Sequence, residues 1–417
     1  MARLLVISFA FPPYHRAGAK RWYSFADELT QLGHEVTVFT SKSFDKRAYQ
    51  EDASLPYRVI RVDRRIPDGL FLPRKGVWGS FSFRLFSLIQ RIKYPGNFYD
   101  FSNGWENYFA HEIPRLISSL GIEHLIITGG PFRYFKYLTD LDLKQVKVTI
   151  DFRDPWTTKS GYVITEKRNK EEREMERSSV ISADMILTAS KDIKTSIEET
   201  FAVDSSDIGN KIFVIENGLD ARMPVNNVSE TVFMNERSCR HLNLIYYGGI
   251  HCNVEHFECF IESIVKYNEE SDKTVKLTLY GNTNLIYNEI VRKSGGDYIQ
   301  VKSRITDTEF LSIAEKTDFF VYFKPFGKLE NSFGVKFFDY LRGRRKILLI
   351  APKGDVVDFV ENNEIGYVLP IVGMFEYLAE LFEKRLKGEI IYESKPELES
   401  ELSIKSRALE IERVLDL

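Results

Sequence analysis

The sequence predicts an α/β protein built from two doubly wound domains, each with a parallel sheet covered by helices. Short apolar runs recur along the chain with helical segments between them, an alternation typical of parallel sheets. The first 40 residues read strand, loop, helix, strand, which is a βαβ unit. A polar stretch without clear periodicity, residues 220–238, interrupts this alternation of strands and helices, which then resumes. We interpret that stretch as a linker between domains.

The predicted N-terminal domain covers residues 1–222. Its first helix has Trp22, Phe25 and Leu29 at helical spacing, and Gly33 ends it. Mixed charges fill "TEKRNKEEREMER", residues 165–177, which we expect to form a solvated helix face with i,i+4 pairs. Strands are predicted at "RLLVISF", "EVTVFT", "YRVIRV", "HLIIT", "VKVTI", "DMILTA" and "KIFVI".

The predicted C-terminal domain covers residues 238–398. We expect the two domains to face a central cleft, and the last helix, residues 402–417, to pack back on the N-terminal domain. Strands are predicted at "LNLIYY", "VKLTLY", "DFFVYF", "KILLI" and "GYVLP".

Composition narrows the class of protein. A net charge of −3 over 417 residues argues against a protein that coats nucleic acid. The three cysteines have no C-x-x-C spacing, and the seven histidines no H-x-H or H-E-x-x-H spacing, so we expect free thiols and no fixed metal. No apolar stretch is long enough to span a membrane. These features predict a cytoplasmic enzyme or binding protein.

Two helix starts are candidate anion sites. Gly18 precedes the first helix among basic residues, and a missing Cβ lets a phosphate approach the backbone. In "ENSFGVKFFDYL", Gly334 opens a helix whose first turn carries Lys336. A cation there opposes the helix dipole unless an anion binds beside it. Asp339, one turn on, could accept hydrogen bonds from vicinal hydroxyls, as acidic residues do on ribose. The alternative is an i,i+3 surface pair of Lys336 and Asp339.

Motifs spread over nearly the whole chain resemble the family 4 retaining glycosyltransferases of the GT-B fold, which build bacterial surface polysaccharides. The motifs are "SFAFPPYHRAGAKRW", "LGHEVTVFT", "IITGGPF", "DFRDPWT", "ADMILTAS", "IFVIENGLD", "LIYYGGI" and "GVKFFDYLRGRRKILLI".

The resemblance implies a donor site for a nucleotide diphosphate sugar. Gly18 and the loop of Gly248 and Gly249 would approach the diphosphate. Backbone donors would come from Phe333, Gly334 and Val335, with Lys336 alongside. Asp339 stands where the family usually has a Glu that binds ribose.

The chain also departs from the family pattern. Asn331 takes the place of another Glu that often precedes the ribose carboxylate, with Glu330 one residue out of register. The Arg and Lys pair common after the glycine loop is missing, and His251 and Asn253 lie there. It is therefore open which residue holds the hydroxyls of the donor sugar.

The segment "DFRDPWT" places Asp151, Arg153 and Asp154 at the carboxyl end of a strand. These groups could orient an acceptor hydroxyl or stabilise charge on the departing diphosphate. The alternative is an internal salt bridge that braces the loop, with Trp156 packed beneath it. A second loop with Gly130 could serve the acceptor.

Residues 70–98 contain no acidic residue but carry several basic and aromatic ones, with Arg84 and Arg91 on one side of a predicted helix. Such a segment could lie on an anionic bilayer at the inner membrane face. The alternative is an excursion packed on its own domain.

Taken together, the sequence predicts a retaining glycosyltransferase that moves a sugar from a UDP- or GDP-linked donor to a saccharide acceptor, expected to be lipid-linked, in O-antigen or capsule biosynthesis. Neither a bound cofactor nor a metal is expected. The rivals are a sugar-nucleotide epimerase of the same architecture and a non-catalytic partner subunit.

Overall fold

The computed structural model describes residues 1–13, 17–42, 52–70, 76–141, 143, 145–158, 165–201, 208–220, 240–250, 252–281, 285–294, 296–326, 333–393 and 395–417. Contacts divide the chain into two compact units. Unit 1 comprises Met1–Asn217 with Ile404–Leu417, and unit 2 comprises Gly218–Ser403. The predicted linker lies outside the described residues, apart from Asp220.

Unit 1 is built on a parallel sheet of 7 strands in the order β3-β2-β1-β4-β5-β6-β7. The order reverses between β1 and β4, which is where ligands bind in open α/β sheets. Its strands are β1 (Arg3–Ile7), β2 (Glu35–Ser41), β3 (Arg58–Val62), β4 (His124–Thr128), β5 (Lys147–Phe152), β6 (Met185–Thr188) and β7 (Ile212–Val214).

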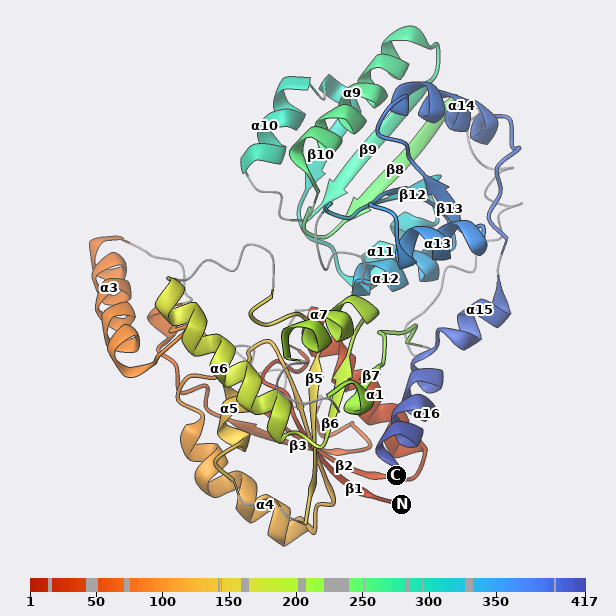
Figure 1. The fold of residues 1–417 in the computed structure, drawn as a ribbon. Coiled ribbons are helices and arrows are strands. Elements are labelled where there is room, and N and C mark those ends of the chain that lie inside the picture. The colour runs from red at the N-terminus through yellow and green to blue at the C-terminus, as the bar shows by residue number, and fades with distance from the viewer. Residues whose placement is uncertain are drawn as a thin grey trace. The chain divides into compact units, whose positions relative to one another are not determined.

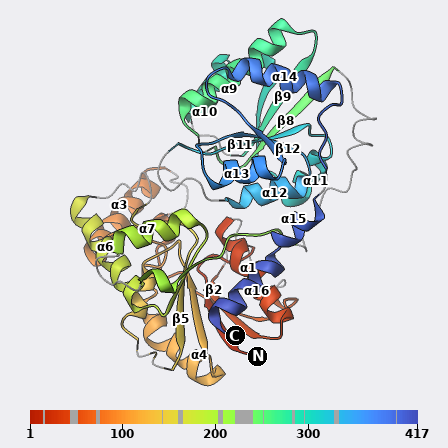
Figure 2. The ribbon, with the colours of Figure 1, turned by 45° about the vertical axis from the view of Figure 1, so that its right-hand side comes forward.

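Helices cover both faces of this sheet (Figure 1). Figure 2 shows α16 beside α1, where Ala408 and Ile411 join Trp22 and Phe25 in one apolar cluster. The helices are α1 (Ala17–Gln31), α3 (Gly76–Lys93), α4 (Ile113–Leu120), α5 (Tyr134–Leu138), α6 (Glu166–Ser182), α7 (Lys191–Phe201) and α16 (Ile404–Leu415), with shorter turns at Asp68–Leu70, Tyr108–Glu112 and Ile208–Lys211.

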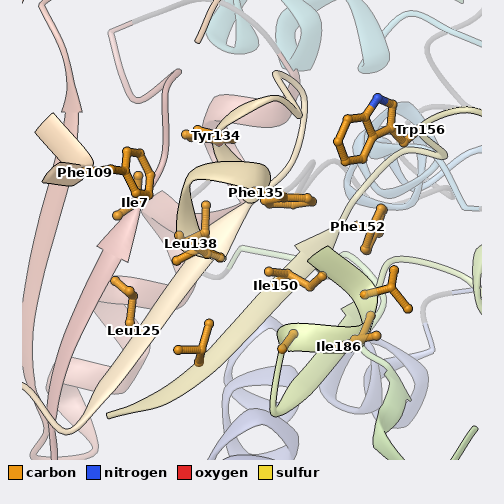
Figure 3. Close-up of a cluster of buried hydrophobic side chains, with 14 of the residues drawn as sticks. Ile7, Phe109, Leu125, Tyr134, Phe135, Leu138, Ile150, Phe152, Trp156 and Ile186 are labelled. Carbon is orange, nitrogen blue, oxygen red and sulfur yellow. The ribbon is translucent and has the colours of Figure 1, made fainter. Parts of the chain in front are cut away.

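The strands of unit 1 alternate their side chains between two apolar clusters, as the period of two along a strand requires. Leu5 and Ile7 of β1 join one cluster, and Leu4 and Val6 join the cluster on the other face. The first cluster continues to the carboxyl ends of the strands, where Trp156 is 1% exposed (Figure 3). The loop after β5 is therefore anchored in the core by its tryptophan.

Unit 2 has a second parallel sheet, of 6 strands in the order β10-β9-β8-β11-β12-β13. Here the order reverses between β8 and β11, which pair directly. The strands are β8 (His241–Tyr247), β9 (Thr274–Tyr280), β10 (Ile299–Lys302), β11 (Phe319–Phe323), β12 (Lys346–Ile350) and β13 (Gly366–Val368).

Two apolar clusters again lie on opposite faces of this sheet. Helices α9, α10 and α14 contribute to one cluster, and α11, α12 and α13 to the other. The helices are α9 (Val254–Glu270), α10 (Leu285–Ser294), α11 (Asp307–Ala314), α12 (Val335–Gly343), α13 (Asp355–Asn362), α14 (Met374–Leu386) and α15 (Pro396–Glu401), with a 3₁₀ turn at Gly296–Tyr298. The predicted α/β class, with two doubly wound parallel sheets, is confirmed.

Candidate functional site

The start of α12 lies at the carboxyl ends of β8 and β11, beside the switch point of unit 2. Gly334 precedes the helix with extended backbone, and the hydroxyl of Tyr322 has a hydrogen bond with its backbone. Phe333 packs its ring against Phe337 and Phe359, at centroid distances of 5.0 and 5.1 Å. Phe333 is therefore an apolar anchor that leads the chain into α12.

In the part of the chain that the structure describes, no side chain caps this helix start. Val335 is the first residue of α12, so the backbone N–H groups of its first turn form the positive end of a helix dipole. Asn331, Ser332 and Glu330 lie outside the described residues, as does His251.

Lys336 turns its ammonium group back towards the end of β8. Its Nζ donates to the hydroxyl of Tyr246 at 2.6 Å and to the carbonyl oxygen of Gly249 at 2.9 Å. The Tyr246 hydroxyl in turn donates to Gly249 O at 2.6 Å, and Nζ lies 4.2 Å from the centre of the Tyr246 ring. A lysine held by neutral oxygens keeps its positive charge available to a bound anion.

The pKa of Lys336 is lowered to about 7, mainly by burial and also by the nearby cations Lys324 and Arg304, while Asp339 acts in the opposite direction. Desolvation and like charges both disfavour the charged form of an amine. A negatively charged ligand would reverse this effect, because it stabilises the ammonium form.

Glycine is required in the loop that Lys336 contacts. Gly248 has φ +98°, and a Cβ there would lie 2.9 Å from the Lys336 side chain. Its N–H donates to Tyr280 O at 2.6 Å. Gly281 has φ +138°, and its Cβ would come within 2.6 Å of Gly248 O. The structure thus brings Gly248, Gly249, Gly334 and Lys336 together within unit 2.

Asp339 lies one turn along α12 but is 7% exposed. Arg342, on the same helix, donates to its Oδ1. The carboxylate is therefore already neutralised by a buried guanidinium. This pairing partner differs from the one that the sequence suggested, because Arg342 and not Lys336 forms the i,i+3 pair.

In unit 1, Asp151 is 0% exposed at the end of β5. Arg21 of α1 donates to its carboxylate through Nε and through Nη2, the latter at 2.9 Å to Oδ1. Trp22 donates its Nε1–H to Oδ2 at 2.7 Å. Nη2 of Arg21 also donates to Ile215 O at 2.7 Å. This geometry supports the alternative interpretation of Asp151, a structural ion pair, with α1 and not Arg153 as the partner.

Arg153 turns towards the loop that follows β4. Its Nε donates to Gly129 O at 2.7 Å and its Nη2 to Gly130 O. Its guanidinium also occupies the space where a side chain of Gly18 would be, since a Cβ there would lie 0.8 Å from Nη1. A side chain at Gly18 would therefore have to displace the guanidinium of Arg153. Asp154, with a half-exposed side chain, lies 3.9 Å from Arg153 Nε.

Most of the charged segment 165–177 lies in α6, which has the expected solvated face, with a surface pair of Glu174 and Arg177, and in addition a buried face. Within α6, Glu172 and Glu176 are each 1% exposed and bind the loop after β5. The sequence carried a signal for this: Glu172, Met175, Glu176 and Ser179 follow one another at helical spacing along one buried face.

Helix α3 exposes a large apolar surface. The exposed fractions reach 84% for Val77, 83% for Trp78 and 78% for Ile92. Its other side packs on unit 1, where Phe83 stacks on Tyr99 at 6.2 Å. Among the described residues, no helix has the length and apolarity to cross a bilayer.

Comparisons with solved structures matched both units at once. TarM from S. aureus, in a complex with UDP, matches with a TM-score of 0.62 at 10% identity over 100% of both chains. The pneumococcal O-GlcNAc transferase GtfA matches with a TM-score of 0.58 at 11% identity, over 100% of this chain and 98% of that one. The fold is GT-B.

A putative UDP-N-acetylglucosamine 2-epimerase from Listeria monocytogenes has a similar fold, with a TM-score of 0.54 at 13% identity over 98% of this chain and 94% of that one. No family model matches the sequence. No curated protein matches it either. The GT-B likeness therefore rests on structure, and sequence identity as low as this establishes the fold alone.

Proposed function

We propose that this chain is a glycosyltransferase that takes a sugar from a UDP- or GDP-linked donor and transfers it to a saccharide acceptor with retention of configuration. The observation that carries the proposal is Lys336, held at the start of α12 by Tyr246 and Gly249 in the second unit of a GT-B fold. The solved GT-B relatives TarM and GtfA were both determined with UDP bound.

The chemistry at this site is stabilisation of a leaving group. When the bond from the anomeric carbon to the diphosphate oxygen breaks, negative charge develops on the diphosphate. The N-terminus of α12 and the ammonium of Lys336 can hold that charge without a metal ion. The acceptor hydroxyl oxygen forms the new bond to the anomeric carbon, and its proton passes to the departing diphosphate oxygen. We assign the acceptor to unit 1, where Arg153, Asp154 and Gly130 are the candidate binding residues.

Titration calorimetry with UDP and with GDP tests the donor site. We expect Lys336→Met to weaken binding at least tenfold, because removal of a hydrogen-bonded charge costs about 1.5–3 kcal/mol. The exposed Lys387 supplies the control variant Lys387→Met, which should bind as the wild type does. If neither nucleotide binds the wild-type protein, the transferase proposal fails and a non-catalytic partner subunit is favoured.

A lipid-linked acceptor at an anionic membrane is the finer part of the proposal, and α3 supports it. At 100° per residue, seven exposed apolar residues fall on one continuous face of the helix. They are Val77, Leu88, Phe81, Ile92, Leu85, Trp78 and Ile89. Arg84 and Arg91 lie along one edge of that face and Lys93 along the other. An apolar face bordered by cations, with no acidic residue in the helix, is typical of helices that lie in a bilayer interface.

Flotation with liposomes that contain anionic lipid tests this part. Replacement of Arg84 and Arg91 by Glu should reduce the bound fraction strongly, since each basic residue near such a surface contributes about 1 kcal/mol. The control variant carries the same replacement by Glu at Arg115, on the exposed side of α4. Equal flotation of both variants would exclude α3 as the contact.

The epimerase with a similar fold supports a second candidate function. An epimerase converts its nucleotide sugar without an acceptor, whereas a transferase needs one. Incubation of the protein with a panel of UDP and GDP sugars alone separates the two, because only an epimerase accumulates an isomeric nucleotide sugar.

A further inference from the structure

Helix α6 carries two carboxylates that point into unit 1 and not into solvent. Glu172 and Glu176 are each 1% exposed, and one helical turn separates them. Buried carboxylates are costly unless hydrogen bonds satisfy them. The donors that satisfy this pair come mainly from the loop after β5, which contains the candidate acceptor-site residues Arg153 and Asp154.

Glu172 joins three segments. Its Oε2 accepts from Trp156 Nε1 at 2.6 Å. Its Oε1 accepts from the backbone N–H of Asn97 at 2.7 Å and lies 3.5 Å from Nη2 of Arg133. Trp156, two residues after Asp154, is therefore both buried in the core and held in one orientation by a hydrogen bond.

Glu176 holds the next residue of the same loop. Its Oε2 accepts from the backbone N–H of Thr157 at 3.2 Å and from the Thr157 hydroxyl. Two donors on one carboxylate oxygen define the path of the backbone as well as the side-chain rotamer.

The neighbouring loop, after β4, is held by the same buried network. Asp100 Oδ2 accepts from the backbone N–H groups of Phe132 and Arg133 at 2.9 and 3.3 Å. The Arg133 side chain then reaches Glu172. The loop with Gly130 and the loop with Arg153 are thus connected through Arg133 and Glu172, besides their direct contact through Arg153.

We propose that Glu172 and Glu176 are positioning residues for the transfer reaction, and that they hold residues 153–157 in the geometry that the acceptor needs. This inference rests on the proposed function, because it assigns a role within the acceptor side of that reaction. Neither carboxylate touches substrate. They act through Trp156 and Thr157.

A pH dependence follows from the burial of Glu176. The pKa of this carboxyl is raised to about 7, mainly by burial and also by Glu172, whereas the Thr157 hydrogen bonds and Arg173 act in the opposite direction. Both Thr157 donors favour the ionised form. Protonation below pH 7 therefore weakens the hold on the loop, and activity should fall as the pH drops through that value.

Steady-state kinetics of the full-length protein, with the donor and acceptor found for the wild type, test the inference from pH 5.5 to 8.5. Glu176→Gln and Thr157→Val should each lower kcat/KM for the acceptor about 10- to 100-fold, the usual effect of misplacing a catalytic group by about 1 Å. The KM for the donor should stay unchanged, because the donor binds unit 2. The acid limb near pH 7 should disappear in Glu176→Gln.

Thr157→Ser keeps both donors and should restore the wild-type values, which a purely apolar role of Thr157 would not allow. Glu174→Gln is the matched control, since Glu174 lies on the exposed side of α6 in a surface pair with Arg177. Thr157→Val and Thr157→Ser leave both carboxylates in place. These two variants therefore still test the positioning role if Glu176→Gln fails to fold. Equal acceptor kinetics for the Val and Ser variants, or an unchanged acid limb in Glu176→Gln, would overturn the positioning role. Absence of transfer by the wild type would instead overturn the proposed function, and this inference with it.

Discussion

Nucleotide binding should be linked to proton uptake through Lys336. Burial and the neighbouring cations hold its pKa at about 7 in the free protein, so the amine is mostly neutral at pH 8. A diphosphate beside it favours the ammonium form, and its pKa then rises towards the usual value near 10.4. Binding above pH 7 must therefore add a proton, and the affinity should fall as the pH rises.

The magnitude follows from the pKa of Lys336. One pH unit corresponds to about 1.4 kcal/mol, so affinity for UDP should fall up to tenfold per unit between pH 7 and 9, about 50-fold in total because the amine is already half neutral at pH 7. In the free protein, the pH dependence of the free energy of unfolding has the opposite sign to that of the UDP affinity. Because the unfolded chain binds more protons between pH 7 and about 10.4, this group makes the free energy of unfolding rise with pH in that range.

Titration calorimetry at pH 8 in buffers with different protonation enthalpies measures the uptake directly. We expect about 0.9 proton per UDP for the wild type, from a pKa of about 7, and close to none for Lys336→Met. The terminal phosphate of UDP is already ionised at this pH and does not obscure the result. Lys387→Met should behave as the wild type. An affinity that is independent of pH, with no proton uptake, would refute the placement of Lys336 beside the diphosphate.

Three further outcomes are expected. Addition of EDTA should leave the transfer rate unchanged, because the proposed charge stabilisation uses α12 and Lys336; loss of activity that Mg²⁺ restores would contradict this. Asp339→Asn should weaken nucleotide binding by about 1–3 kcal/mol if Asp339 binds ribose, and unchanged binding with a lower melting temperature would assign it to its pair with Arg342. Arg21→Met should lower the free energy of unfolding by about 3–5 kcal/mol in urea titrations, because it strands the buried Asp151 carboxylate.

The strands were largely predictable because most of them are continuous apolar runs. β4 and β12, for example, have the sequences HLIIT and KILLI, and their central residues are buried. β10, with the sequence IQVK, was missed because it is an edge strand in which only Ile299 is buried. β10 lacks the apolar run that burial on both faces imposes on a strand.

The candidate site was predictable in its glycines and its lysine but not in its contacts. The sequence placed Gly248, Gly249 and Gly334 at strand ends and helix starts, where parallel sheets bind ligands. It contained no pattern that links Lys336 to Tyr246, because these residues are 90 positions apart. The same limit applies to Asp151, whose partner Arg21 lies 130 positions away. Spacing within one motif favours a local partner, and only tertiary packing brings the distant one.

The two cations Arg21 and Lys336 differ in the charge of the groups that hold them. This difference assigns Arg21 a structural role and makes Lys336 a candidate for ligand binding. Arg21 is 4% exposed and its guanidinium is matched by the carboxylate of Asp151, so its positive charge is neutralised within unit 1. Among the described residues, the Lys336 ammonium donates to a hydroxyl and to a carbonyl oxygen, both uncharged. A partly buried cation with neutral partners costs free energy that the fold alone does not recover. The start of α12, which adds positive potential at the same place, increases that cost in the free protein. A bound anion removes both contributions at once, which is why Lys336 is the stronger candidate for ligand binding.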